Sequence, residues 1–127
     1  MQRDWDLIRA LMLRAENLET DKKLDEAFDR WDEKTVKEHL RLMYEKGLID
    51  AVVSAYGNTI GRVVVNRVTW EGHDFLAAIK NETIWKQVTG HVKKTVGEVT
   101  IDVLKSLLQD AMKLAVTASV AVAAAAR

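Results

Sequence analysis

The sequence of 127 residues contains no cysteine and no proline. Without cysteine the chain can form neither a disulfide nor a thiolate metal site, and this composition favours a reducing compartment. The first residues contain no apolar h-region, so no signal peptide is predicted. The longest run of low polarity, residues 114–126, is shorter than the about 20 apolar residues that a membrane span needs. We therefore expect a cytoplasmic protein without a membrane partner.

The chain also lacks an excess of charge, because its 19 basic residues are balanced by 19 acidic ones. This balance argues against a protein that coats nucleic acid along its whole surface. The charges are unevenly distributed, however. Residues 1–33 carry 6 basic and 10 acidic side chains, residues 34–70 carry 6 and 3, and residues 71–127 carry 7 and 6. The segment 34–70 is therefore the only clearly positive part of the chain.

Recognisable catalytic motifs are missing as well. The three histidines, His39, His73 and His91, are far apart and form no HExxH or HxxxH pair, so no metal site is predicted. The glycines form no phosphate-binding loop, and no Ser-His-Asp arrangement follows from the spacing. We predict a protein that is not an enzyme and has no cofactor. His73 is expected to form a hydrogen bond within the fold.

The clearest helical pattern lies in residues 32–47. Asp32 or Glu33 begins the helix, Lys46 lies in its last turn and Gly47 can adopt a left-handed cap. Apolar residues recur at helical spacing along it: Val36, Leu40 and Met43. The sequence therefore predicts a capped amphipathic helix that leads directly into Leu48 and Ile49.

Residues 49–68 contain two β-branched runs separated by a Gly-Asn-Thr-Ile-Gly turn, which predicts a β-hairpin. Apolar and polar residues alternate imperfectly along both strands. A two-stranded ribbon is only marginally stable alone, so we expect it to lie against helices or a partner. Ile60 at the tip is unusually apolar for a solvated loop, and contact with a partner or groove is one interpretation of it.

Helices are predicted on both sides of this block. The helix at 3–18 has an apolar stripe of Trp5, Ile8, Leu11, Met12, Ala15 and Leu18, and a short one near 24–31 has Leu24, Ala27, Phe28 and Trp31. The helix that follows the hairpin has Thr69 as its N-cap and a predicted buried stripe of Trp70, Phe75, Leu76 and Ile79. Trp5, Phe28 and Trp31 are assigned to core or edge packing, because aromatic residues at helical spacing usually bury their surface.

Two further helices are predicted after a break at Asn81, the first ending at Gly97 and the second beginning near Thr100. The last helix has a stripe of Ile101, Leu104, Leu107, Leu108, Ala111, Leu114 and Ala115. Beyond Leu114 its residues are almost all small, and it has too little polar surface to remain in water. We expect this arm to form a homo-oligomer with another subunit. The alternative is that it folds back on its own domain or frays.

The helix ending in Gly-Leu-Ile, the hairpin and the segment RVTWEGHDFLAAI together resemble the winged-helix DNA-binding domain. In that domain a recognition helix runs into a two-stranded wing. The strings RDWDLIRALML, EHLRLMYEKGLIDA and TWEGHDFLAAIKNETIWKQV also resemble a family of small uncharacterised bacterial and phage proteins, classified as a domain of unknown function. This resemblance covers roughly residues 2–105. TWEGHDFLAAI is its most specific string.

The resemblance implies a mainly helical α+β fold, with a winged helix-turn-helix core over residues 1–81. Residues 82–127 would then form a C-terminal helical extension used for oligomerisation. It also implies a transcriptional regulator that binds duplex DNA as a homodimer. The alternative is a winged-helix module for protein interaction, or an oligomeric scaffold, without DNA binding.

If the resemblance holds, the helix around 33–46 and the wing around 51–68 contact DNA. The implied contact residues are Lys34, Thr35, Lys37, Glu38 and Arg41 on the helix, and Asn58, Thr59, Arg62 and Arg67 on the wing. Lys37 and Arg41 would read guanine or hold phosphate. His39, on the same helix, would either face DNA or pack within the fold. Glu38 departs from many winged-helix repressors, because a carboxylate repels phosphate unless it accepts a hydrogen bond from a cytosine amine.

Overall fold

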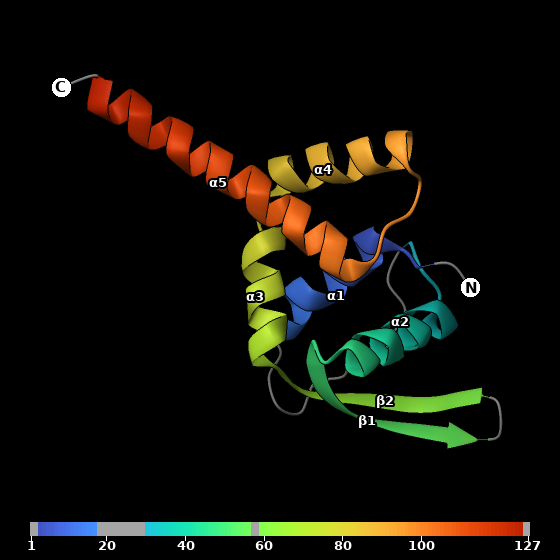
Figure 1. Cartoon of the computed structure of the whole chain (residues 1–127). Helices are drawn as coiled ribbons and strands as arrows, with labels where there is room; N and C mark the ends of the chain where they lie inside the picture. Colours follow the sequence, from blue (N-terminus) through green and yellow to red (C-terminus); the bar gives the residue numbers. More distant parts are fainter. Residues whose placement is uncertain (1–2, 18–29, 57–58, 126–127) are drawn as a thin grey trace. The chain divides into compact units, whose positions relative to one another are not determined.

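The computed structural model describes residues 3–17, 30–56 and 59–125, with the side chains of residues 55, 56, 59, 60 and 121–125 left aside. The described residues form a mainly helical α+β fold, as predicted, with five helices and a two-stranded antiparallel sheet (Figure 1). In chain order the elements are α1 (Trp5–Glu16), α2 (Glu33–Lys46), β1 (Ile49–Tyr56), β2 (Thr59–Val68), α3 (Trp70–Ile79), α4 (Glu82–Thr95) and α5 (Ile101–Ala125).

The chain divides into two compact units, Met1–Leu76 and Ala77–Arg127. The boundary falls within α3, five residues before the predicted one at 81/82. The first unit holds α1, α2 and the β-ribbon, and the second holds α4 and α5. The candidate site lies entirely in the first unit.

Helix α1 begins where a side-chain cap is available. The carboxylate of Asp4 accepts hydrogen bonds from the backbone N–H groups of Asp6 and Leu7. The buried stripe confirms the predicted helical period and consists of Leu7, Ile8, Leu11, Met12 and Ala15. Trp5 is half-buried. Most of the predicted helix near 24–31 lies outside the described residues.

Helix α2 has the predicted ends. The Asp32 carboxylate accepts a hydrogen bond from the backbone N–H of Thr35, at 2.8 Å. Gly47 ends the helix in the left-handed conformation, with φ 87°. The buried face consists of Val36, His39, Leu40 and Met43, so His39 packs in the core rather than facing solvent.

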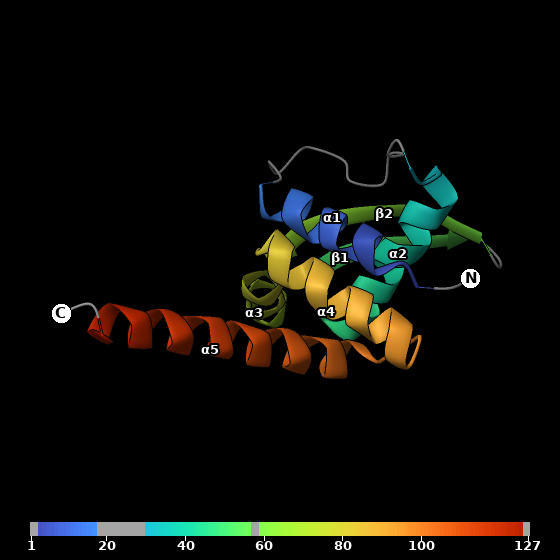
Figure 2. The same cartoon turned by 90° about the horizontal axis from the view of Figure 1, so that it is seen from above.

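The β-ribbon follows α2 after only Gly47 and Leu48, and it runs beside α2 in both views (Figures 1 and 2). Two register shifts on β2 leave Gly61 and Asn66 without a partner residue on β1. The extra residue at Asn66 returns Val68 to the face that already holds Val63 and Val65, and all three are buried. These bulges explain the imperfect alternation in the sequence, because each one changes the phase of the two-residue period.

Thr69 joins the end of α2 to the start of α3. Its backbone N–H donates to the Leu48 carbonyl at 3.1 Å, and its hydroxyl donates to the Gly47 carbonyl. The same hydroxyl accepts from the backbone N–H of Gly72 at 3.1 Å, which confirms Thr69 as the predicted N-cap. A Cβ on Gly72 would lie 2.0 Å from the Leu48 oxygen, so only glycine permits this close approach.

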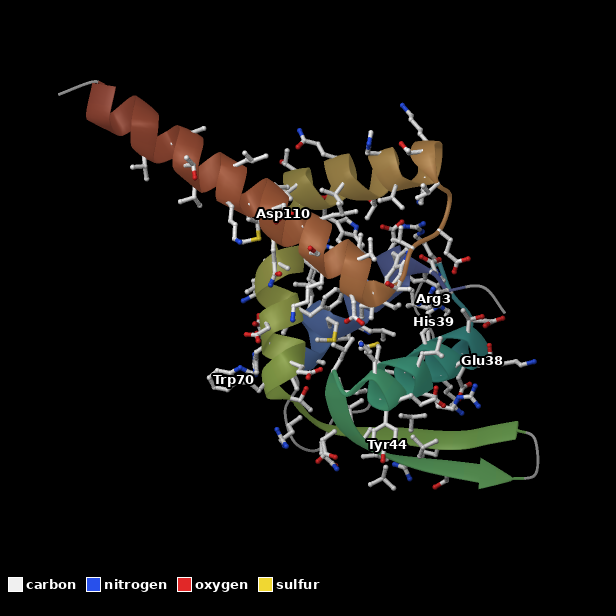
Figure 3. All side chains as sticks on the ribbon, in the orientation of Figure 1. Arg3, Glu38, His39, Tyr44, Trp70 and Asp110 are labelled. Atoms are coloured by element: carbon white, nitrogen blue, oxygen red, sulfur yellow. The ribbon has the colours of Figure 1, made fainter. Side chains whose placement is uncertain are left out.

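The predicted burial of Trp70 is wrong. Phe75, Leu76 and Ile79 are buried as expected, but Trp70 is 83% exposed and projects away from α3 (Figure 3). At about 100° per residue, Trp70 lies on the side of the helix opposite the other three residues. The predicted stripe includes Trp70, although its position does not match the helical period.

In the second unit the predicted break at Asn81 is confirmed, and Asn81 also caps α4 by accepting from the backbone N–H of Ile84 at 3.0 Å. Gly97 follows the end of α4, as predicted. Helices α4 and α5 pack against one another, with Leu104 and Leu108 of α5 buried. Leu107 is 39% exposed and Leu114 is 73% exposed, and every side chain described from 113 to 120 is exposed.

Within the described ranges, no helix has the length and apolar character required to cross a membrane.

Candidate nucleic-acid interface

The solvent side of α2 presents part of the predicted contact set. Lys34 and Arg41 are exposed. Glu38, which Figure 3 labels on α2, is half-buried. Arg41 lies 3.6 Å from the carboxylate of Glu45, one turn along the helix. This exposed i,i+4 pair is weak, so the Arg41 guanidinium can exchange Glu45 for another anion at little cost.

Thr35 is engaged within α2 through its backbone. Its N–H donates to the Asp32 cap, and its carbonyl oxygen lies 2.8 Å from Nδ1 of His39. Hydrogen bonds from Thr35 lower the pKa of Asp32 below its ordinary value of 3.8. The larger effect comes from the Thr35 side chain and the smaller one from its backbone N–H. The start of α2 therefore carries a carboxylate charge near Lys34.

Lys37 is held within the protein. Its ammonium donates to the carbonyl oxygen of Gly61 at 3.0 Å and lies 2.9 Å from the carboxylate of Glu33. The Lys37 side chain is only 16% exposed. This residue therefore connects α2 to β2, whereas Lys34 and Arg41 extend towards solvent.

The ribbon contributes two exposed arginines. Arg62 follows the bulge at Gly61, and Arg67 is 66% exposed and lies 3.9 Å from the Asp50 carboxylate on the opposite strand. Asn58 lies outside the described residues. Thr59 begins β2, but its side chain is not among those described.

A hydrogen-bonded cluster that the sequence did not reveal fixes the start of α2 to α1. His39 is fully buried; its Nε2 accepts from the backbone N–H of Asp4 at 2.8 Å, and its Nδ1 donates to the Thr35 carbonyl. These partners assign the neutral Nδ1–H tautomer. The indole N–H of Trp31 donates to the Asp4 carboxylate at 2.7 Å.

Asp4 is the ionised member of this cluster. Burial on its own would raise the pKa of Asp4, but the hydrogen bonds from Trp31 and from the backbone N–H groups of Leu7 and Asp6 outweigh that effect. The pKa of Asp4 is therefore below 3.8, and the carboxylate stays charged at neutral pH.

Helical spacing from Val36 to His39 to Met43 could have indicated that His39 faces inward.

The chemistry available at this surface is anion binding. It offers guanidinium and ammonium groups on α2 and the ribbon, with the carboxylates of Glu38 and Glu45 interspersed. In the part of the chain that the structure describes, no three His, Cys, Asp or Glu residues are grouped so that they could hold a metal ion.

Comparison with known proteins gives a family and one relative. A model of the family described as "Hypothetical protein (DUF2513)" matches residues 2–98, a span that ends before α5. A Haemophilus influenzae protein described as an uncharacterized protein is 31% identical over 111 residues, which cover 86% of this chain and 93% of that protein. No solved structure is significantly similar to the chain.

Proposed function

The chain belongs to the DUF2513 family, and on this premise we propose that it is a DNA-binding regulator with a winged-helix first unit. In this proposal α2 is the recognition helix, and the β1–β2 ribbon is the wing beside it. Duplex DNA is contacted by the solvent side of α2 and by the ribbon.

The observation that carries the proposal is the direct connection from α2 to the ribbon. Gly47 and Leu48 alone separate the two elements, and the ribbon returns beside α2 (Figures 1 and 2). This connection leaves Lys34 and Arg41 exposed on the helix and Arg62 exposed on the adjoining strand. Cationic side chains on a helix and an adjacent ribbon suit the successive phosphates and groove edges of a duplex.

The small number of available cations makes the proposed binding weak and dependent on salt. Each phosphate neutralised contributes about −0.9 to the slope of log K against log salt concentration. The contacts made by the first unit of a single subunit therefore give a shallow dependence of log K on log salt concentration. Specific binding requires two subunits. In the proposed homodimer, pairing through α5 brings two recognition helices to half-sites about one DNA turn apart.

A mobility-shift assay against pooled genomic fragments at low salt tests the proposal. The wild-type protein is expected to retain a subset of fragments, and the Arg41→Ala, Arg62→Ala double variant is expected to lose them. Lys93→Ala, Lys94→Ala is the matched control, because it removes two exposed positive charges from α4 instead. The absence of retention by the wild type at every salt concentration would refute the proposal.

The second candidate function is a protein-interaction module, and the exposed indole of Trp70 favours it. A tryptophan that is 83% exposed gains nothing from the core, and tryptophan is enriched at binding hot spots. The acidic residues Glu38 and Glu45 beside Lys34 and Arg41 also suit a protein partner better than phosphate. This candidate predicts that Trp70→Ala abolishes recovery of a stoichiometric partner, whereas charge reversal at Lys34 does not.

A further inference from the structure

Lys37 differs from the other predicted contact residues because its ammonium already has two partners inside the first unit. It joins Glu33, one turn earlier on α2, to the carbonyl oxygen of Gly61 on β2. The side chain is mostly covered, at 16% exposure, whereas the Glu33 side chain is 62% exposed. These two partners leave one donor of the ammonium for a phosphate, on a side chain that is mostly covered.

Gly61 lies at an irregular point of β2. The register passes from the pair Ser54 and Arg62 to the pair Ala55 and Ile60, which leaves Gly61 as an extra residue on β2. A residue at a bulge interrupts the ladder of hydrogen bonds between strands. Lys37 supplies a charge-assisted hydrogen bond to the Gly61 carbonyl at this point, and such bonds are stronger than neutral ones.

We infer that Lys37 is a positioning residue, whose bridge from Glu33 to Gly61 fixes the ribbon against α2. Arg62 follows Gly61 directly. The bridge therefore also fixes the backbone position from which the Arg62 side chain extends, relative to Lys34 and Arg41. The inference rests on the proposed function, because it assigns Lys37 to arranging the DNA-contacting cations and removes it from direct contact.

The test compares Lys37→Met with Lys34→Met, since both remove one ammonium from the same helix and only the first breaks the bridge. Without DNA, Lys37→Met is expected to speed hydrogen exchange of the Arg62–Val65 amides by roughly tenfold or more, and Lys34→Met to leave it unchanged. Lys37→Arg, which keeps a cationic donor, is expected to restore most of the protection.

Duplex binding over a range of salt concentrations supplies the second measurement. Lys34→Met is expected to reduce the salt slope by about 0.9, as the loss of one phosphate contact does. Lys37→Met is expected to keep the salt slope of the wild type. It is also expected to raise Kd more than Lys34→Met does. A slope lowered by about 0.9 in Lys37→Met, with unchanged amide exchange, would make Lys37 a direct contact and overturn the inference.

The two measurements separate this inference from the proposed function. If the wild-type protein binds no duplex, the proposed function fails, and the assignment of Lys37 to arranging DNA contacts fails with it. If the wild type binds duplex but amide exchange in Lys37→Met is unchanged, only the bridge is refuted.

Discussion

At the scale of single residues, the cluster of Asp4, Trp31 and His39 shows what a sequence pattern leaves out. Asp4 is the N-cap of α1, and this role follows from local chemistry. Its contacts with Trp31 and His39 span 27 and 35 residues of chain. Periodicity within one helix carries no information about such pairs. Helical spacing could indicate that His39 is buried, but it could not identify the hydrogen-bond partners.

Asp4 predicts a specific acid dependence of stability. Because its folded pKa is below 3.8, its contribution is fully present above the unfolded pKa and is lost as pH falls through the folded value. Asp4→Asn cannot ionise, so this part of the acid dependence should disappear. Urea unfolding at about pH 7 and about pH 3 measures the change in the free energy of unfolding.

The matched control for this prediction is Asp110→Asn, which removes an exposed carboxylate from α5. It should retain the wild-type difference in unfolding free energy between the two pH values. Equal acid dependence in Asp4→Asn and in the wild type would contradict the role assigned to the Asp4 carboxylate.

At the scale of helices and strands, the ends were more predictable than the faces. The caps Asp32, Gly47 and Thr69 were predictable because capping depends on residues within one turn. The bulges at Gly61 and Asn66 were not, because register depends on both strands and on the helices that they pack against. Trp70 is exposed because helical position, and not aromatic character, decides which face of α3 a residue occupies.

Gly72 and Gly90 provide opposite outcomes for the same substitution. Gly72→Ala places a Cβ 2.0 Å from the Leu48 oxygen, so it should destabilise the protein by about 1–3 kcal/mol or more. A Cβ on Gly90, within α4, meets no described atom within 4 Å, so Gly90→Ala should stabilise it by about 1 kcal/mol. Thermal or urea unfolding measures both. A neutral Gly72→Ala would show that α3 does not need this close approach to Leu48.

At the scale of the whole molecule, the sequence predicted the order of elements and the exposure of Lys34, Arg41 and Arg62. It could not show that Lys37 is engaged by Gly61, because that contact depends on a bulge 24 residues later in the chain. The net charge of a segment counts every charged side chain, including those such as Lys37 that are already engaged by partners within the protein. The positive segment therefore offers fewer available cations than its composition indicates.

The exposed second half of α5 leads to a prediction about assembly. Leu114, Val116 and Val120 are each more than 60% exposed, and in the proposed dimer α5 of a second subunit covers them. Light scattering at micromolar concentration should give a dimeric mass for the wild type and a lower mass for Leu114→Asp. Thr83→Asp adds the same charge at an exposed position of α4 and should remain dimeric. A monomeric wild type would remove the proposed pairing.

We propose that α2 and the adjoining ribbon form one surface that binds duplex DNA. The most direct measurement is amide chemical-shift mapping of the protein while a retained duplex is added. We predict that the largest changes lie at residues 33–46 and 59–68, with little change in α4. Changes centred on Trp70, or no changes at saturating duplex, would contradict the claim.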